Sequence, residues 1–436
     1  MDDGDPRNKP PCRREDALAV VRALYTAGHI AYFAGGCVRD LLLQLEPKDY
    51  DVATDAVPEK VRSLFRNTQA VGQAFGVILV RQGQSVIEVA TFRTDGEYVD
   101  GRRPSEVRFT TAEEDARRRD FTINGLFLDP IEDRILDFVG GKQDLERKIL
   151  RAIGEPDARF EEDHLRLMRA VRFAARFNLD IETRTRAAIL NHAPQLARIS
   201  PERVGEEMRL MLTPATRVKA WQYLGDLGLL PVVLRFLQEK SRRPNYIDKY
   251  YWPLFPEVSP GAPIGFGVAL AALTLSYRQN VVDGDTAGRN LLTTLEIRKS
   301  VQACRKSMKI SNAEADAMTQ TMQVDHLLRD EPPSIAKMKR FIASPFSEEA
   351  RKLLDALNKA NSSLTRILWL QEQFIKLEQS DCSPPPFVTG DDLTAAGLHP
   401  GPLFKRVLET VYDAQLEDRI TSKDAALELS LQLAKA

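Results

Sequence analysis

Residues 35–54, GGCVRDLLLQLEPKDYDVAT, place a glycine pair before a helical run and two acids on either side of one tyrosine. A strand has a period of two, so Asp49 and Asp51 would share one face and Tyr50 would lie on the other. Two like charges about 6–7 Å apart repel each other unless a cation lies between them. The segment therefore predicts a turn, a helix and a strand that together hold a metal ion.

The glycine pair stands between a predicted strand, AYFA, and a predicted helix, VRDLLLQL. Gly35 and Gly36 would let backbone N–H groups approach an anion, and Arg39 would offer a fork for phosphate. Asp49 and Asp51 suit Mg²⁺, which usually binds one or two carboxylates plus substrate phosphates. Two such ions would activate an attacking hydroxyl and stabilise a leaving pyrophosphate. The alternative is an ordinary helix start beside a solvated acidic turn.

The chain of 436 residues is too long for one ordinary core, so several domains are expected. Short β-rich runs separated by turns continue to about residue 150, and predict an α+β region. Beyond it the pattern becomes helical. Proline-rich stretches at 243–263 and 380–387 predict a loop or linker and a stiff spacer.

Composition excludes some classes of protein. No run of about eighteen uncharged apolar residues occurs, so no membrane span is expected. A net charge of −1 argues against coating nucleic acid by bulk charge, and leaves room for a local basic patch. The cysteines form neither a CxxC pair nor a disulfide framework, which predicts free thiols and a cytoplasmic protein. They are Cys12, Cys37, Cys304 and Cys382.

Two further stretches carry polar side chains at suggestive spacings. In RRDFTING, Arg119, Asp120 and Asn124 could contact ribose hydroxyls and a triphosphate, or form a surface ion pair that caps a helix. In EEDHLRLMRAVRF, we expect Asp163 and Arg166 on one helix face, where they could read a base edge or form an intrahelical ion pair.

Arg169, Arg172 and Arg176 extend this cationic pattern at helical spacing. They could face the nucleotide or RNA, or form buried pairs with acids. Glu88, in the strand SVIEVATF, is a candidate third carboxylate near the metals. A strand acid paired with Arg93 or Arg119 is the alternative.

The ordered set of motifs resembles the DNA polymerase beta nucleotidyltransferase superfamily. Within it, the set is similar to the class II tRNA nucleotidyltransferases (CCA-adding enzymes) and the bacterial poly(A) polymerases. The resemblance covers roughly residues 20–215, in the family's order. The matching stretches are GGCVRDLLLQLEPKDYDVAT, VIEVATFRTDGEYVDGRRPSEVRF, RRDFTINGL, LDFVGGKQDLERKILRAIG, RFEEDHLRLMRAVRFAARF and SPERVGEEMRLML.

The resemblance implies a nucleotidyltransferase head with a mixed sheet, followed by an elongated all-α neck, body and tail. The implied domains are the head at 1–153, a nucleotide-selecting neck at 154–215, a body at 216–380 and an RNA-binding tail at 381–436. The tail would lie against the tRNA elbow. The loop at 94–104 would move as the selected base changes. Its presence argues against an enzyme that adds only CC, because such relatives lack an intact loop here.

The implied activity is template-independent, Mg²⁺-dependent addition of CTP and ATP to the 3′ end of tRNA, with pyrophosphate release. Asp49 and Asp51 would hold two metals, and the glycine turn with Arg39 would hold the triphosphate. Asp163 with Arg166 would select the base, oriented by Glu162, and Arg169 would also contact the nucleotide. Poly(A) polymerase or A-adding activity is the alternative. A non-catalytic RNA-binding protein or a small-molecule nucleotidyltransferase are alternatives of other classes. The sequence leaves the oligomeric state open.

Overall fold

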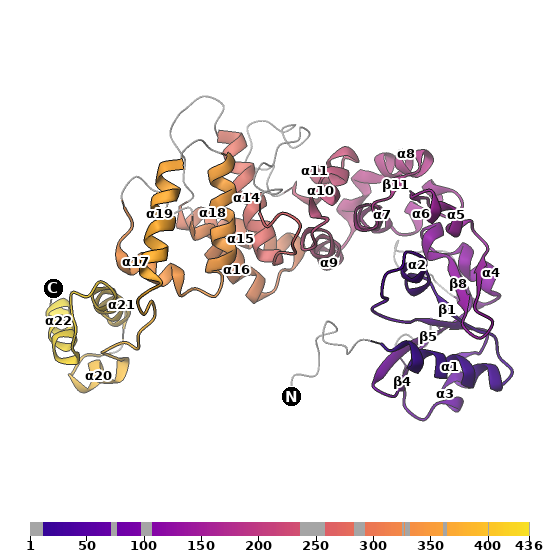
Figure 1. The fold of residues 1–436 in the computed structure, drawn as a ribbon, viewed down its shortest axis with the longest axis horizontal. Coiled ribbons are helices and arrows are strands. Elements are labelled where there is room, and N and C mark those ends of the chain that lie inside the picture. The colour runs from indigo at the N-terminus through magenta and orange to yellow at the C-terminus, as the bar shows by residue number, and fades with distance from the viewer. Residues whose placement is uncertain are drawn as a thin grey trace. The chain divides into compact units, whose positions relative to one another are not determined.

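The computed structural model describes residues 12–70, 76–96, 107–235, 258–282, 293–324, 327, 332–360, 364–399 and 401–435. These residues fall into two compact units (Figure 1). The first comprises Met1–Met211 and Lys219–Arg235, and the second comprises Leu212–Val218 and Phe236–Ala436. Most of the loop predicted at 94–104 and most of the proline-rich stretch predicted at 243–263 lie outside the described residues, which omit 97–106 and 236–257.

Within the described residues, the first unit is built on one seven-stranded sheet. In sheet order its strands are β3 (Thr68–Ala70), β4 (Val77–Gln82), β5 (Ser85–Thr91), β2 (Val52–Thr54), β1 (Ala31–Ala34), β8 (Leu126–Asp129) and β9 (Arg134–Asp137). Strand β2 runs parallel to β5 and antiparallel to β1, so the predicted mixed sheet is confirmed. Two shorter pairs accompany it, β6 (Arg93–Asp95) with β7 (Val107–Phe109) and β10 (Ile149–Leu150) with β11 (Asp180–Ile181).

Helix α1 (Arg14–Thr26) packs on strands β1, β2, β4 and β5. Ala17, Val20, Val21 and Leu24 follow helical spacing and are buried. Burial of a side chain the size of valine or leucine stabilises the fold by about 1.5–3 kcal/mol. The helix ends just before Gly28, whose φ of +84° is the left-handed conformation that glycine favours.

The remaining helices of the first unit lie between the strands or follow them, and those after β11 form a helical region. They are α2 (Gly36–Leu42), α3 (Pro58–Leu64), α4 (Ala112–Arg117), η3 (Thr122–Asn124), α5 (Gly141–Glu146), α6 (Pro156–Glu162), α7 (Arg166–Arg176), α8 (Thr183–His192), η4 (Ala193–Arg198), α9 (Pro201–Leu212), α10 (Arg217–Asp226) and α11 (Leu230–Val233).

The hairpin formed by β8 and β9 was not predicted from the sequence. Its turn depends on Asp129, whose Oδ1 accepts hydrogen bonds from the N–H groups of Ile131 (2.9 Å) and Glu132 (3.2 Å). Aspartate favours such turns because its side chain can satisfy nearby backbone donors. Strand β8 pairs with β1, so this hairpin borders the strand that leads into the glycine turn.

The described part of the second unit is helical. Its helices are α14 (Phe266–Val282), α15 (Thr294–Met308), α16 (Asn312–Gln323), α17 (Ile335–Ile342), α18 (Ser347–Ala360), α19 (Leu364–Leu377), α20 (Gly390–Ala395), α21 (Pro402–Leu416) and α22 (Lys423–Lys435). Helices α14 and α16 approach closely at Gly267, where a Cβ would lie 2.8 Å from the Cβ of Ala317. A larger residue at Gly267 would therefore force the two helices apart.

The last three helices enclose a small core of their own. Val388, Leu393, Val407, Val411 and Ala426 form it. Pro402 occupies the first turn of α21, where its missing N–H costs no hydrogen bond.

The sequence predicted no membrane span and free cysteine thiols. None of the described helices combines the length and apolar character needed to cross a membrane. All four cysteines are free thiols, and three of them, Cys12, Cys37 and Cys304, are buried.

Candidate active site

The glycine turn lies between β1 and α2. Gly35 precedes α2 with φ +68° and ψ −116°, a backbone conformation that residues other than glycine rarely adopt. A Cβ on Gly35 would lie 2.7 Å from Nη1 of Arg119. The N–H of Gly35 donates to the carbonyl oxygen of Leu126 on β8 at 2.9 Å. Glycine is thus required here both by the backbone angle and by the neighbouring guanidinium.

The two acids lie in the extended segment just before β2, a small correction to their predicted place on the strand itself. Asp49 and Asp51 are exposed, whereas Tyr50 is 6% exposed and its ring packs on Phe33 at 5.2 Å between centroids. The predicted alternation is therefore present. The N–H of Ala34 donates to the carbonyl oxygen of Asp51 at 3.0 Å, so Asp51 is held next to the residue that precedes the glycine turn.

Glu88 is exposed on β5, the strand parallel to β2. Val52 lies opposite Val89 in this pairing, so Glu88 comes one residue before the part of β5 that pairs with β2, just as Asp51 comes one residue before β2. Among the described residues, no group of three His, Cys, Asp or Glu side chains is arranged to hold a metal ion. A third carboxylate at this site remains a prediction.

Arg39 on α2 is 4% exposed, and its guanidinium is enclosed by protein groups. Nε and Nη2 donate to Oδ1 of Asp40 at 2.9 and 2.6 Å, and Nη1 donates to Oδ1 of Asn124 at 2.6 Å. The guanidinium also stacks over the ring of Phe177, 4.2 Å from its centroid. Its predicted contact with a triphosphate would have to compete with these bonds.

Asp120, in the stretch RRDFTING, is hydrogen-bonded to helix α7. Its Oδ1 accepts from the N–H of Phe121 (2.9 Å) and from Nδ2 of Asn124 (3.0 Å), and its Oδ2 accepts from Nε of Arg169 (2.8 Å). Burial opposes ionisation of Asp120, but Arg169 and Asn124 outweigh it and hold the pKa at about 2. Asp120 is thus a buried anion that links two segments of the unit.

Arg119 lies beside this group and is held by α4. Its Nη2 pairs with Oδ2 of Asp115 at 2.9 Å, and its Nη1 donates to the carbonyl oxygen of Asn124 at 3.3 Å. Its guanidinium stacks 5.0 Å from the centroid of Phe127. Arg119 therefore borders the glycine turn from the side of β8.

The expected helix through Asp163 and Arg166 is wrong. Helix α6 ends at Glu162, Asp163 is extended (φ −151°, ψ 103°), and α7 begins at Arg166. Oδ1 of Asp163 accepts from the N–H of Leu165 at 3.0 Å, a local bond that competes with helical bonds. The two residues border a turn between helices, and do not neighbour each other on one helical face.

Glu162 contacts Arg166, one of the two residues that it is predicted to orient. Its Oε2 pairs with Nη1 of Arg166, and Nη1 of Arg166 also donates to the carbonyl oxygen of Arg159 at 2.9 Å. Arg159 itself donates to both carboxylate oxygens of Glu162 at 2.9 Å. These bonds fix the orientation of the Arg166 guanidinium.

Two models of protein families match the chain, the Poly A polymerase head domain at 31–151 and the probable RNA and SrmB-binding site of polymerase A at 178–240. The CCA-adding enzyme of Bacillus subtilis (strain 168) is 36% identical over 311 residues, which are 68% of this chain and 77% of that enzyme. The chain belongs to the family of CCA-adding enzymes and bacterial poly(A) polymerases.

Both branches of this family are similar to the chain. Poly(A) polymerase I of Salmonella typhi is 41% identical over 242 residues, which are 52% of each chain. The chain spans 60% of the length of several other CCA-adding enzymes that it matches. The solved structure of the Bacillus stearothermophilus CCA-adding enzyme in complex with CTP aligns over 97% of this chain and 98% of that chain, with a TM-score of 0.72 and 28% identity.

In this family member the arginines of α7 are paired, which is the alternative that the sequence left open. Arg169 pairs with Asp120 at 2.7 Å, Arg172 with Glu207 at 2.7 Å, and Arg176 with Asp40 at 4.0 Å. The acids come from three different segments. The cationic edge of α7 is therefore largely neutralised within the unit.

Sequence reasoning missed Arg203 on α9. Its Nη2 pairs with Oδ2 of Asp163 at 2.6 Å and so holds the predicted base-reading carboxylate. Arg203 lies in the motif SPERVGEEMRLML, but its partner is 40 residues away along the chain. No local spacing pattern would have joined the two.

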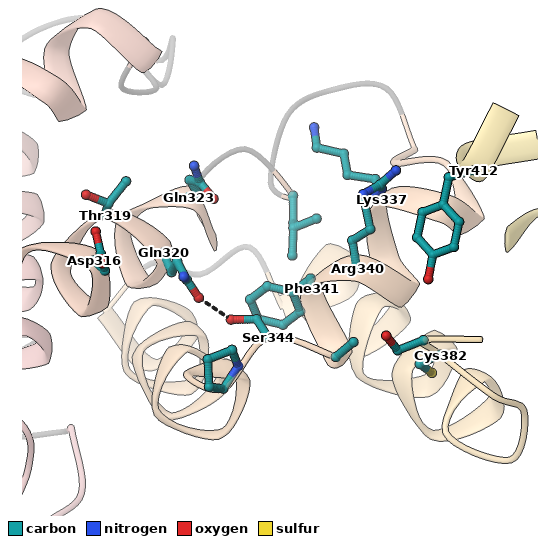
Figure 2. Close-up of a pocket in the computed structure, with 14 residues that line it drawn as sticks. Asp316, Thr319, Gln320, Gln323, Lys337, Arg340, Phe341, Ser344, Cys382 and Tyr412 are labelled. Atoms are coloured by element: carbon teal, nitrogen blue, oxygen red, sulfur yellow. Dashed lines mark hydrogen bonds between the residues drawn. The ribbon is translucent and has the colours of Figure 1, made fainter. Parts of the chain in front are cut away.

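A cavity of about 760 Å³ lies in the second unit and contains none of the predicted site residues (Figure 2). Its lining includes Gln320, Arg340, Ser344 and Tyr412, and Ser344 donates to Oε1 of Gln320. Arg340 pairs with Asp413 at 2.7 Å, so its charge is neutralised by the protein itself. The residues predicted for catalysis all belong to the first unit.

Proposed function

We propose that this protein adds CTP and ATP to the 3′ end of tRNA without a nucleic-acid template and releases pyrophosphate. One arrangement supports it most directly: two exposed carboxylates, Asp49 and Asp51, lie beside a glycine turn whose geometry excludes side chains. A relative that is named a CCA-adding enzyme aligns over 77% of its own length.

Asp49 and Asp51 would hold Mg²⁺. Their chemistry fits this ion, because both offer exposed carboxylate oxygens on either side of the buried Tyr50, and Mg²⁺ prefers one or two carboxylates plus phosphate oxygens. When bound, the metal would lower the pKa of the attacking 3′-hydroxyl and stabilise charge on the leaving pyrophosphate.

The other residues bind and orient the substrates in this proposal. The Gly35–Gly36 turn lets the triphosphate approach the backbone closely. Asp163 keeps acceptor capacity beyond its bonds to Leu165 and Arg203, since a carboxylate has about four lone-pair sites. It would accept from the exocyclic amine that cytosine and adenine share, and Arg166 would donate to the adjacent ring nitrogen.

We further propose that the protein works in the reducing cytoplasm. All four cysteines are free, and burial raises the pKa of Cys37 and of Cys304 to about 12, which keeps both thiols protonated and unreactive.

The activity can be tested with three tRNA transcripts that lack CCA, lack CA or lack only A. Each is incubated with the protein, Mg²⁺ and one or both of CTP and ATP, and the products are resolved at single-nucleotide resolution. We expect CTP alone to extend the first transcript by two nucleotides and the second by one. ATP alone should complete the third transcript, and CTP with ATP should complete all three. ATP use on the last transcript alone, with no CTP use on any, would refute CCA addition.

Poly(A) polymerase activity is the second candidate, because Poly(A) polymerase I of Salmonella typhi is 41% identical over 52% of this chain. The same assay decides between the two. Long ATP-dependent tails on any RNA 3′ end would favour the polymerase. Addition that stops after one adenosine favours the CCA-adding enzyme.

A further inference from the structure

Helix α15 exposes a row of positive charges. Its exposed cations, with one at the residue that follows the helix, are Arg298, Lys299, Arg305, Lys306 and Lys309. Residues 298, 305 and 309 follow the i, i+7, i+11 spacing of a single helical face, and 299 and 306 lie beside that face. The row is about 16 Å long at 1.5 Å per residue.

The opposite face of α15 is apolar and buried. It consists of Ile297, Val301, Cys304 and Met308. Helix α15 is thus anchored in the second unit by one face and presents its cations to solvent on the other. The helix starts with a capping box between Thr293 and Glu296, which fixes its first turn.

The five cations have no acidic partner in the part of the chain that the structure describes. Arg305 donates through Nη1 to Oδ1 of Asn312 at 2.9 Å, but that amide oxygen carries no charge. Like charges at i, i+4 and i, i+7 along one face repel each other, so the row is unfavourable for the isolated helix. A polyanionic ligand would remove this repulsion.

The backbone conformation of Lys309 is a second indication that the positive charges of α15 have a function. It follows α15 in the left-handed conformation, with φ +47° and ψ +50°, a position where glycine is preferred. A lysine at this position bears backbone strain that a glycine would not. The charge is therefore placed where the backbone alone would favour another residue.

We propose that the exposed face of α15 binds the sugar–phosphate backbone of the RNA substrate. The proposal rests on the proposed function for the identity of the RNA. Lysine and arginine in an unpaired row are suited to phosphates, which bind them without regard to sequence. A protein partner fits less well, because protein–protein interfaces are depleted in lysine and three of the five cations are lysines.

The test uses a triple variant, Arg298→Gln, Arg305→Gln and Lys309→Gln. The control triple, Arg134→Gln, Lys352→Gln and Arg419→Gln, removes the same net charge from residues that are paired with acids elsewhere on the surface. Affinity for a tRNA transcript lacking CCA is measured from 50 to 200 mM KCl. We expect at least about a tenfold loss in the α15 variant and a salt slope shallower by about two to three units.

A second variant separates binding from stability. Lys309→Gly relieves the left-handed backbone and removes one charge. We expect an unchanged or higher melting temperature together with weaker RNA binding. Weaker binding with a lower melting temperature in this variant would point to damage to the helix, and would count against the proposal.

The outcome for α15 is distinguishable from that for the proposed function. If the wild-type protein adds nucleotides and the α15 triple binds tRNA as tightly as the control triple at every salt concentration, the surface is refuted and the function stands. If the wild-type protein adds nothing but the α15 triple alone loses RNA affinity, the surface stands and the proposed function falls.

Discussion

Helices α7 and α15 carry similar runs of positive charge and use them in opposite ways. On α7, Arg169, Arg172 and Arg176 are paired with acids of the same unit, and Arg172 is buried. On α15, the cations are exposed and lack described acidic partners. Positive charge at helical spacing can thus build an internal scaffold or an external surface. The difference lies in whether distant segments supply carboxylates.

The largest effect should come from the two exposed acids before β2, Asp49 and Asp51. We expect Asp49→Asn and Asp51→Asn each to reduce nucleotide addition by roughly a thousandfold, because each removes charge that would hold the metal. Addition is measured by single-turnover extension of tRNA lacking CCA. RNA affinity should change little, because the RNA surface proposed on α15 is untouched. Turnover within a few-fold of the wild type in either variant would refute the metal assignment.

Next is the buried pair of Arg172 and Glu207. Arg172→Met leaves a buried carboxylate without its partner, and we expect the free energy of unfolding to fall by about 3–5 kcal/mol. Urea denaturation measures it. The double variant with Glu207→Met should recover most of the loss, since two apolar side chains can replace a buried ion pair.

Arg298→Gln on α15 is the matched control for that measurement. An exposed cation without a described partner should change stability by less than about 0.5 kcal/mol. Equal destabilisation by Arg172→Met and Arg298→Gln would break the distinction between the two helices.

A smaller effect is expected from pH. The folded pKa of Asp120, about 2, lies below the value near 3.9 of an unfolded aspartate. Its contribution to stability, about 2 kcal/mol, is therefore fully present above pH 3.9 and is lost as the pH falls towards 2. Urea denaturation between pH 7 and pH 3 should show a decline that is smaller in Asp120→Asn. The α15 triple variant should keep the wild-type decline.

An effect of similar size, on catalysis and not on stability, is expected at Arg203. Arg203→Met removes the bond to Oδ2 of Asp163, and a hydrogen bond between charged groups contributes about 1.5–3 kcal/mol. We expect the catalytic efficiency for CTP and ATP to fall by about tenfold or somewhat more, with RNA affinity unchanged. Initial rates at saturating tRNA measure it. A loss of RNA affinity instead would assign Arg203 to the same class as the α15 cations.

Local patterns predicted those parts of the fold that depend on near neighbours. The strand before Gly35, the helix after it and the alternation of Asp49, Tyr50 and Asp51 all follow from period, turn chemistry and burial over a few residues. The mixed sheet and the helical second unit followed from resemblance combined with these patterns.

Contacts between distant segments could not be predicted in the same way. Arg172 and Glu207 are 35 residues apart, and Arg169 and Asp120 are 49 apart, so no helical spacing relates them. The helix break at Asp163 was missed because DxxR fits helical spacing well, and the side-chain bonds of Asp163 to Leu165 and Arg203 are not visible in that spacing. The hairpin of β8 and β9 was hidden because its strands are short and its turn depends on one aspartate.

A continuous chain of hydrogen bonds links Arg39, Asn124, Asp120 and Arg169. It ties the start of α2, beside the glycine turn, to α7, the helix that follows Asp163. Under the proposed function, the residues that align the phosphates and the helix that follows the base-reading carboxylate are therefore held by the same hydrogen bonds. A substitution within this chain, at Asn124 for example, is expected to change both the rate of addition and the choice of base.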